Sequence, residues 1–128
     1  MTYVDGFLIP IPKSKMAQYR KFAKLGRDMW MEHGALDYKE CVADEMFSQF
    51  PDEKGRLKKA PSLFPKMAHA KRGETIVFSF IVFKSKAHRD RVNKKVLTDP
   101  RMATIDPAAM PIDGKRFGYG GFKVFVEA

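Results

Sequence analysis

The sequence contains a single cysteine and no long apolar run. Cys41 has no second cysteine to pair with, so an internal disulfide is excluded and a reducing compartment is indicated. No apolar segment approaches the roughly 20 residues of a membrane-spanning helix. The N-terminus also lacks the basic start, apolar core and small-residue cleavage site of a signal peptide. We therefore expect a cytoplasmic protein.

Motifs for metal and cofactor binding are also missing. His33, His69 and His88 are far apart in the sequence, and no pair of them, or of histidine with Cys41, has the spacing of zinc ligands. No Gly-x-Gly-x-x-Gly motif follows a strand pattern and no phosphate-binding loop is present. We expect no metal and no nucleotide or other cofactor.

Acidic residues are outnumbered by basic ones, 15 against 24, and the net charge of +9 favours acidic partners without identifying one. A hydrophobic content of 45% excludes an intrinsically disordered chain. A length of 128 residues suits one domain, because two smaller domains would each bury a poor core. We therefore expect residues 1–128 to form a single domain.

The first part of the chain shows a strand, a helix and a second strand. Residues 3–11 are rich in β-branched and aromatic side chains, with Pro10 expected at a strand end or a sheet edge. Apolar residues then recur at helical spacing between a predicted N-cap at Ser14 and a stop at Gly34. Residues 35–44 return to a period of two, which predicts the second strand.

The second part repeats this alternation in the order strand, helix, strand. Residues 75–83 are apolar or β-branched on both faces, with Ser79 the exception. Ser85 can cap a helix that runs to about Thr98, and residues 119–126 predict the last strand.

This order predicts an α+β, ferredoxin-like βαββαβ fold, with a four-stranded antiparallel sheet and two helices on one face. The helices would leave Phe78 and Phe80 uncovered, although burying each such side chain contributes about 1.5–3 kcal/mol. We predict that a second copy covers them, which makes a homodimer through the sheet face. The alternative is that residues 45–73, an irregular basic segment with one helical turn expected near residues 62–69, fold over the sheet within one chain.

Five segments of the sequence resemble one protein family. They are Tyr3-Val4-Asp5-Gly6-Phe7, His33-Gly34-Ala35-Leu36-Asp37-Tyr38 with Glu40-Cys41-Val42, Phe83-Lys84-Ser85-Lys86-Ala87-His88-Arg89-Asp90-Arg91-Val92-Asn93, Met110-Pro111 with Asp113-Gly114-Lys115-Arg116, and Tyr119-Gly120-Gly121-Phe122. On these segments the chain is identified as a member of the DUF1428 family of small bacterial proteins. The resemblance implies a dimeric α/β-barrel fold. The wider superfamily of that fold includes cofactor-free monooxygenases, haem-degrading enzymes and stress-response proteins, so the resemblance implies no single activity.

Two carboxylates are the first candidates for chemistry. Glu40 and Asp5 each lie in a predicted strand among mostly apolar neighbours on the same face, and Tyr38 is one neighbour of Glu40. A carboxylate in such surroundings can act as a general acid or base. We predict Glu40 as a catalytic residue, with Asp5 and Tyr38 as ligand contacts. The alternative is that either carboxylate pairs with a base such as Arg89 or faces water at an edge.

The start of the second helix supplies the next candidates. His88 and Val92 share one helical face, so His88 is expected to point toward the sheet and Arg89 toward its margin. A histidine beside a pocket can be a general base. We predict His88 as a second catalytic residue, with Arg89 and Asn93 as ligand contacts. The alternative is a packed histidine and a structural ion pair.

Trp30 and His33 share the first helix and resemble the aromatic and imidazole lining of substrate pockets in the superfamily. We predict that Trp30 contacts a ligand; the alternative is that it packs in the core. The candidates together predict a small molecule bound in a cleft between helices and sheet. Monooxygenase-like chemistry is implied by the resemblance alone, and the residues do not decide whether the protein is an enzyme.

An alternative function is a basic, RNA-associated binding module. The βαββαβ order is shared with the RNA recognition motif, and residues 115–122 resemble its basic-aromatic signature. The signature belongs on the third strand, however, whereas residues 115–122 lead into the last one. This alternative therefore predicts only a weak, salt-sensitive attraction of the basic surface for phosphates.

Overall fold

Alternating apolar residues build the sheet at the centre of the molecule. The computed structural model describes the whole chain, residues 1–128. The strands of the main sheet lie in the order β2-β5-β1-β6, and each neighbouring pair is antiparallel. These strands are β1 (Tyr3–Pro12), β2 (Asp37–Val42), β5 (Glu74–Phe83) and β6 (Gly118–Lys123). The protein therefore has a mixed α+β fold around an antiparallel sheet.

The strand bounds differ in detail from those expected. β2 begins at Asp37 and ends at Val42, so it is shorter than the predicted segment, and β6 ends at Lys123 rather than Val126. The pairing of β1 with β6 ends at Leu8, two residues before Pro10. Pro10 therefore lies where β1 has a neighbour on one side only, a position that tolerates a missing N–H group.

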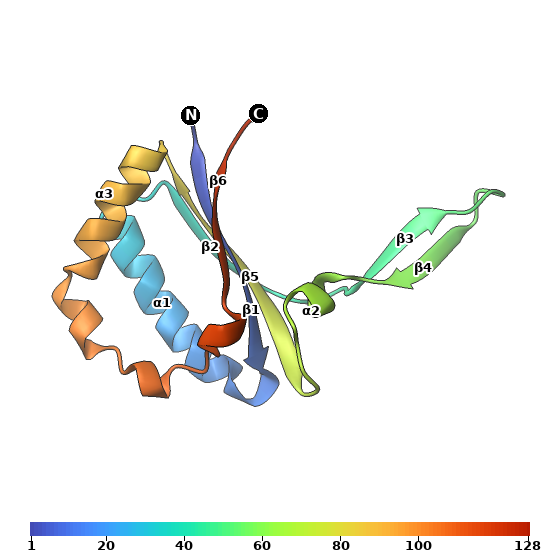
Figure 1. Cartoon of the computed structure of the whole chain (residues 1–128), viewed down its shortest axis with the longest axis horizontal. Helices are drawn as coiled ribbons and strands as arrows, with labels where there is room; N and C mark the ends of the chain where they lie inside the picture. Colours follow the sequence, from blue (N-terminus) through green and yellow to red (C-terminus); the bar gives the residue numbers. More distant parts are fainter.

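Two helices cover one face of this sheet (Figure 1). The 3-10 turn Lys13–Lys15 leads into α1 (Met16–Glu32), so the prediction of Ser14 as the N-cap was wrong: Ser14 lies inside the turn. The second helix is α3 (Lys86–Leu97), and its predicted cap is present, because the Ser85 hydroxyl accepts a hydrogen bond from the His88 N–H group.

Gly34 makes the turn from α1 into β2. Its φ is +114°, a conformation that glycine adopts at little cost and other residues rarely adopt. This turn returns the chain to the sheet directly beneath α1, so residues of β2 face residues of the helix.

The core lies between the helices and the face of the sheet formed by the odd-numbered residues of β1 and β5. It contains two apolar clusters, one built from Ile9, Ile11, Tyr19, Ala23 and Val77 and the other from Met29, Ala35, Ile81, Phe83, Val92 and Val96. Side chains of β1, β5, α1 and α3 pack against one another in these clusters, and this packing holds both helices on the sheet.

The opposite face of the sheet is open. Phe78 is 48% exposed and Phe122 is 60% exposed, although both belong to strands of the main sheet. The short helix α2 (Phe64–Met67) lies on this side and covers it in part, because the Phe64 ring stands 6.5 Å from the Phe78 ring. We call this surface the open face.

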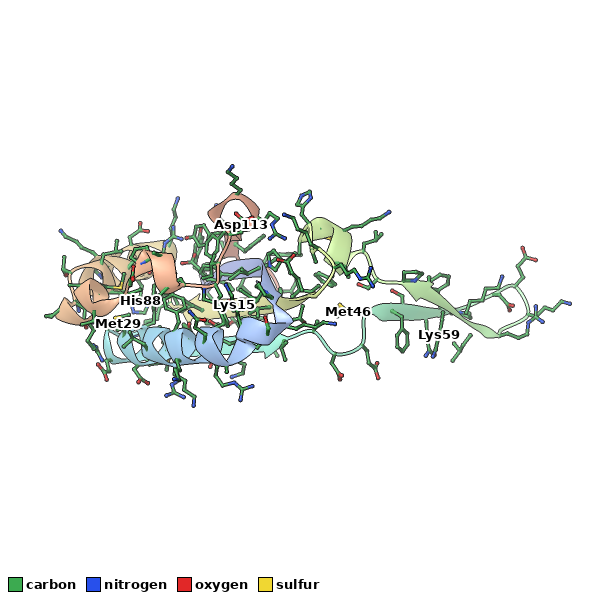
Figure 2. The ribbon with its side chains drawn as sticks, turned by 90° about the horizontal axis from the view of Figure 1, so that it is seen from below. Lys15, Met29, Met46, Lys59, His88 and Asp113 are labelled. Atoms are coloured by element: carbon green, nitrogen blue, oxygen red, sulfur yellow. The ribbon has the colours of Figure 1, made fainter.

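Residues 45–73, expected to be irregular apart from one helical turn, contain a β-hairpin as well as α2. Its strands are β3 (Phe47–Pro51) and β4 (Leu57–Pro61), and nearly all their residues are exposed. The hairpin projects away from the body on the side of the sheet opposite α1 and α3 (Figure 1). Figure 2 shows Lys59 on the hairpin, at the far end of the molecule from Met29 and His88.

A segment with little regular structure, residues 98–117, connects α3 to β6. We call it the strap; it contains the 3-10 turns Pro100–Thr104, Pro107–Ala109 and Gly114–Arg116. The Gln18 side chain donates a hydrogen bond to the Ala109 carbonyl, which ties the strap to α1. None of the helices has the length and apolar character needed to cross a membrane.

Candidate functional site

A cavity of about 290 Å³ lies between α1, the sheet and the strap. Ten of its thirteen lining residues are hydrophobic, and a single residue, Glu40, is charged. The lining consists of Phe7, Ile9, Tyr19, Phe22, Gly26, Trp30, Tyr38, Glu40, Ser79, Ile81, Met110, Ile112 and Phe117. We call it the Glu40 pocket. Its size and apolar lining with few polar groups are typical of small-molecule sites.

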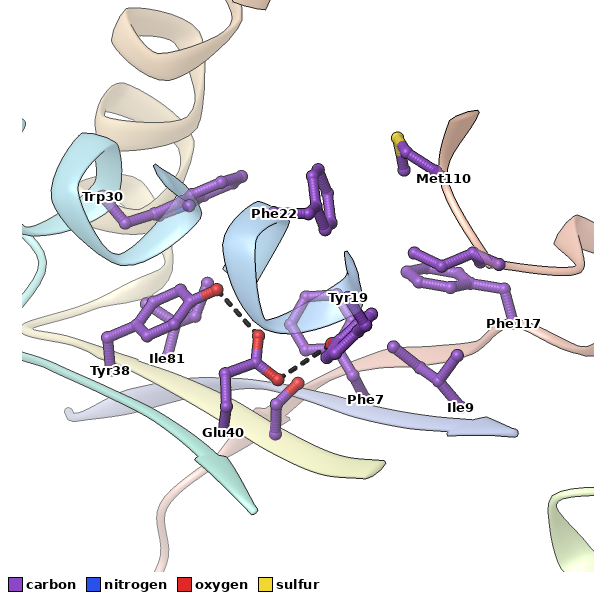
Figure 3. A pocket seen from close by; sticks show the side chains of 13 residues that line it. Phe7, Ile9, Tyr19, Phe22, Trp30, Tyr38, Glu40, Ile81, Met110 and Phe117 are labelled. Carbon is purple, nitrogen blue, oxygen red and sulfur yellow. Dashed lines mark hydrogen bonds between the residues drawn. The ribbon is translucent and has the colours of Figure 1, made fainter. Parts of the chain in front are cut away.

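Two tyrosines hold the Glu40 carboxylate (Figure 3). The Tyr38 hydroxyl donates to Oε1 at 2.8 Å, and the Tyr19 hydroxyl donates to Oε2 at 2.9 Å. Tyr38 lies two residues before Glu40 on the same face of β2, whereas Tyr19 reaches it from α1. Each carboxylate oxygen therefore has one fixed donor, and neither donor carries a positive charge.

The backbone around Glu40 explains why these groups meet. Glu40 pairs with Ser79 and Tyr38 pairs with Ile81 in the β2–β5 ladder, so all four side chains point to the helical side. Gly26 of α1 faces Tyr38, and a Cβ atom at Gly26 would stand 2.8 Å from the tyrosine hydroxyl oxygen. Glycine thus allows the hydroxyl to approach the helix closely.

Burial and the Glu40 carboxylate both act on the two tyrosines. Burial, followed by the charge of Glu40 and the hydrogen bond to it, raises the pKa of Tyr19 and of Tyr38 well above the ordinary value. Both hydroxyls therefore remain protonated donors throughout the physiological pH range.

Trp30 forms part of the pocket wall, and a side chain of α3 holds its indole ring in place. Its Nε1–H group donates to the Asn93 side-chain oxygen of α3 at 3.0 Å, and its ring centre is 6.4 Å from that of Tyr38. Asn93, predicted as a ligand contact, is absent from the pocket lining and contacts Trp30 instead. Its position orients the indole ring rather than a ligand.

Asp5 and Arg89 are paired with each other at 2.6 Å, away from the pocket. Asp5 is 2% exposed, and Arg89 also donates to the Tyr119 hydroxyl at 2.9 Å and lies over the Tyr3 ring. Burial, then the charge of Asp5, raises the pKa of Tyr119, while Arg89 opposes that increase. This cluster joins α3 to β1 and β6.

His88 lies at the start of α3, and its ring packs edge-on against Phe83. The ring Nδ1 accepts a hydrogen bond from the Lys84 N–H group at 3.0 Å. Burial, together with the charges of Lys84 and Arg91, lowers the pKa of His88 below its ordinary value. His88 is absent from the Glu40 pocket, so the structure does not bring the two predicted catalytic residues together.

Sequence comparison identifies the family. The model of the family described as "Protein of unknown function (DUF1428)" matches residues 2–114. The chain belongs to the DUF1428 family. It is 38% identical over 127 residues to the uncharacterized protein YbaA of Escherichia coli K12, a match that covers 99% of both chains, and equally similar to YbaA of Shigella flexneri.

The fold of this DUF1428 protein is also found in a solved structure. An uncharacterized NIPSNAP domain protein from Burkholderia xenovorans superposes with a TM-score of 0.52 at 12% sequence identity, covering 98% of this chain and 99% of the other. At that identity the likeness concerns the fold alone.

The structure divides the predicted site residues of the DUF1428 chain into two sets. Glu40, Tyr38 and Trp30 line one pocket, whereas the remaining predicted residues, Asp5, His88, Arg89 and Asn93, do not line it. No group of three or more His, Cys, Asp or Glu side chains converges as a metal site would require.

Sequence reasoning missed the residues that complete the pocket. Tyr19 belongs to the apolar residues that recur at helical spacing between Ser14 and Gly34, and nothing in that spacing identifies it as a donor to Glu40. Met110, Ile112 and Phe117 come from the strap, which has no periodic pattern. Only the two prolines and the Asp-Gly pair within residues 107–114 mark that segment as structured.

The basic-aromatic segment of residues 115–122 is used within the chain. Arg116 forms ion pairs with Glu74 at 2.6 Å and with Asp113 at 2.8 Å, Phe117 lines the pocket, and Tyr119 accepts from Arg89. Phe122 lies on the open face. The RNA-binding alternative stays a prediction, and filter binding at low ionic strength would test it.

Proposed function

We propose that this protein binds a small, largely apolar molecule in the Glu40 pocket. The pocket itself carries the proposal, because a cavity of about 290 Å³ lies open beside a carboxylate that has no cationic partner. A packed core would have filled this space with side chains. An arrangement that serves only stability would have neutralised the charge.

The pocket also offers a route to chemistry. Glu40 can accept a proton from a bound molecule, and the hydroxyls of Tyr19 and Tyr38 can adjust their hydrogen bonds as that charge changes. The superfamily resemblance extends the proposal to cofactor-independent, monooxygenase-like reaction of an electron-rich ligand with O₂. An oxygen electrode tests this extension: ligand-dependent oxygen consumption that is lost in Glu40→Gln supports it, and no consumption limits the protein to binding.

A thermal-shift screen of metabolites tests the binding proposal. A ligand that binds only the folded state raises the melting temperature, by an amount that grows with its concentration above Kd. Compounds that raise the melting temperature of the wild type should do so less in Glu40→Gln and equally in Glu53→Gln. Glu53 lies exposed at the tip of the hairpin and provides the same change of charge outside the pocket. A screen in which no compound stabilises the wild type contradicts the proposal.

We also propose that the chain forms a ferredoxin-like homodimer of the dimeric α/β-barrel type, through the open face. The strand order β2-β5-β1-β6 supports this proposal, as does the exposure of Phe78 and Phe122 on one face. A hollow of about 340 Å³ beside Phe64 and Phe78 is a further uncovered apolar surface there. The alternative is that residues 45–73 cover the open face within one chain. Of these residues, α2 lies on that face, whereas the hairpin projects outward (Figure 1).

Size-exclusion chromatography with light scattering tests the homodimer. We expect a particle of twice 14.7 kDa for the wild type and a monomer for Phe78→Asp, because the new charge would be buried at the interface. The exposed change Lys54→Asp on the hairpin tip serves as control. A wild-type particle near the mass of one chain would contradict the homodimer and leave the pocket proposal intact.

A further inference from the structure

The hydrogen-bond donors around the Glu40 pocket are almost all in use. The Tyr19 and Tyr38 hydroxyls donate to Glu40, and the Trp30 N–H group donates to Asn93. Among the lining side chains, Ser79 alone keeps a donor, and a hydroxyl can equally act as an acceptor. A ligand that brings only acceptors therefore finds almost no side chain to satisfy them.

Acceptor capacity, in contrast, remains free. An ionised carboxylate has about four lone-pair sites, and the two tyrosines occupy one on each oxygen of Glu40. Glu40 can therefore accept a further hydrogen bond from a molecule in the cavity.

The charges near the pocket strengthen this preference. No cationic side chain lines it. Arg20, Lys24 and Arg27 line a neighbouring groove that Tyr38 and Glu40 also border, but none of the three cations lines the Glu40 pocket or forms an ion pair with Glu40. An anionic ligand inside the pocket would therefore meet the Glu40 charge with no cationic side chain among the lining residues.

We infer that the Glu40 pocket selects neutral aromatic molecules that donate a hydrogen bond, such as phenols and aromatic amines, and rejects aromatic carboxylates. This inference rests on the proposed binding function and specifies the chemistry of its ligand. The aromatic side chains Phe7, Phe22 and Trp30 provide the apolar contact surface, and Glu40 provides the one charged point of recognition.

Isothermal titration calorimetry with four matched probes tests the inference. p-Cresol and p-toluidine donate a hydrogen bond, 4-methylanisole differs from p-cresol by the loss of the donor, and p-toluate is an anion of similar shape. We expect p-cresol to bind about tenfold or more tightly than 4-methylanisole, the ratio expected for a hydrogen bond to a charged acceptor. p-Toluidine should bind like p-cresol, and p-toluate should bind most weakly.

The variants Glu40→Gln and Glu53→Gln show whether the preference comes from Glu40. In Glu40→Gln the preference for p-cresol over 4-methylanisole should fall below about threefold, because the charged acceptor is gone. Glu53→Gln should keep the wild-type ratio. Equal affinities in the wild type, tightest binding of p-toluate, or an unchanged ratio in Glu40→Gln would overturn the inference while leaving the binding function in place. Absence of binding by all four probes would contradict both.

Discussion

Asp5 and Glu40 lie on the same face of one sheet, beneath the same layer of helices, but they have different partners. Asp5 is 2% exposed and forms an ion pair with Arg89 at 2.6 Å. Glu40 is partly buried, borders a cavity and is held by two uncharged hydroxyls at 2.8 and 2.9 Å.

The difference separates a structural carboxylate from a candidate functional one. A buried carboxylate paired with a largely buried guanidinium that has further hydrogen bonds forms a closed arrangement, which leaves no room or charge for a ligand. A carboxylate with spare acceptor sites beside a cavity leaves both room and charge for a ligand. Such a carboxylate can still accept a hydrogen bond from a bound molecule, so removing the carboxylate should affect binding more than folding.

Breaking the closed pair should have the largest effect on stability. Asp5→Asn leaves the largely buried Arg89 guanidinium with only the exposed Asp90 carboxylate, 2.8 Å away, as a neutralising partner, so we expect a loss of about 3 kcal/mol in the free energy of unfolding. Urea denaturation measures this loss. Asp44→Asn removes an exposed carboxylate after β2 and should change stability little. A cost below about 1 kcal/mol for Asp5→Asn would show that the pair is not structural.

An intermediate, pH-dependent effect is expected at the start of β5. The hydrogen bonds from Arg116 lower the pKa of Glu74 from 4.5 to about 2. Because the folded-state pKa is lowered, the stabilisation is complete above pH 4.5 and is lost as the pH falls toward 2. The stability difference between wild type and Glu74→Gln should therefore be largest near neutral pH and shrink below pH 4.5. A difference that stays constant down to pH 2 contradicts this assignment.

Removing one tyrosine hydroxyl should cost less. Tyr38→Phe deletes a hydrogen bond to the charged Glu40 carboxylate. Because Glu40 borders a cavity, water can replace the lost hydroxyl as a donor, so we expect a loss of about 1–2 kcal/mol in the free energy of unfolding. A double-mutant cycle with Glu40→Gln measures the coupling between the two side chains. Coupling indistinguishable from zero would mean that Tyr38 does not hold Glu40 in solution.

The smallest effect on stability is expected for Glu40→Gln itself. The amide keeps the shape of the carboxylate, accepts from one tyrosine and donates to the other, so the free energy of unfolding should change by less than about 1 kcal/mol. The matched comparison with Asp5→Asn is the sharpest test of the difference between the two carboxylates. Similar losses in both variants would remove the distinction.

The parts of the fold that the sequence predicts are those with a strong local pattern. Period-two alternation predicts β2, runs of β-branched and aromatic residues predict β1 and β5, and Ser85 predicts the start of α3. The β3–β4 hairpin has no such signal, because Lys58 and Lys59 interrupt its apolar residues and its turn lacks an Asn-Gly or Asp-Gly pair. The sequence therefore predicts an irregular basic segment where the structure has these two strands.

Only the part of the candidate site that lies on β2 could be predicted from the sequence. Tyr38 and Glu40 are neighbours on one strand face, so period two places them together. Tyr19 meets them only because Gly34 turns the chain back beneath α1, and a tertiary contact of this kind leaves no mark on local spacing. For the same reason the pattern favoured Asp5 and Glu40 equally, since Arg89, which pairs with Asp5, lies 84 residues away.

Trp30 allows a direct test of whether a ligand occupies the pocket, because it is the only tryptophan of the chain and lines the cavity. Its fluorescence can be followed while the wild-type protein is titrated with p-cresol. We expect a saturable change in emission, with the same midpoint as the calorimetric titration and a much weaker affinity in Glu40→Gln. A change that never saturates, or the same saturation curve in wild type and Glu40→Gln, would contradict a ligand site at this carboxylate.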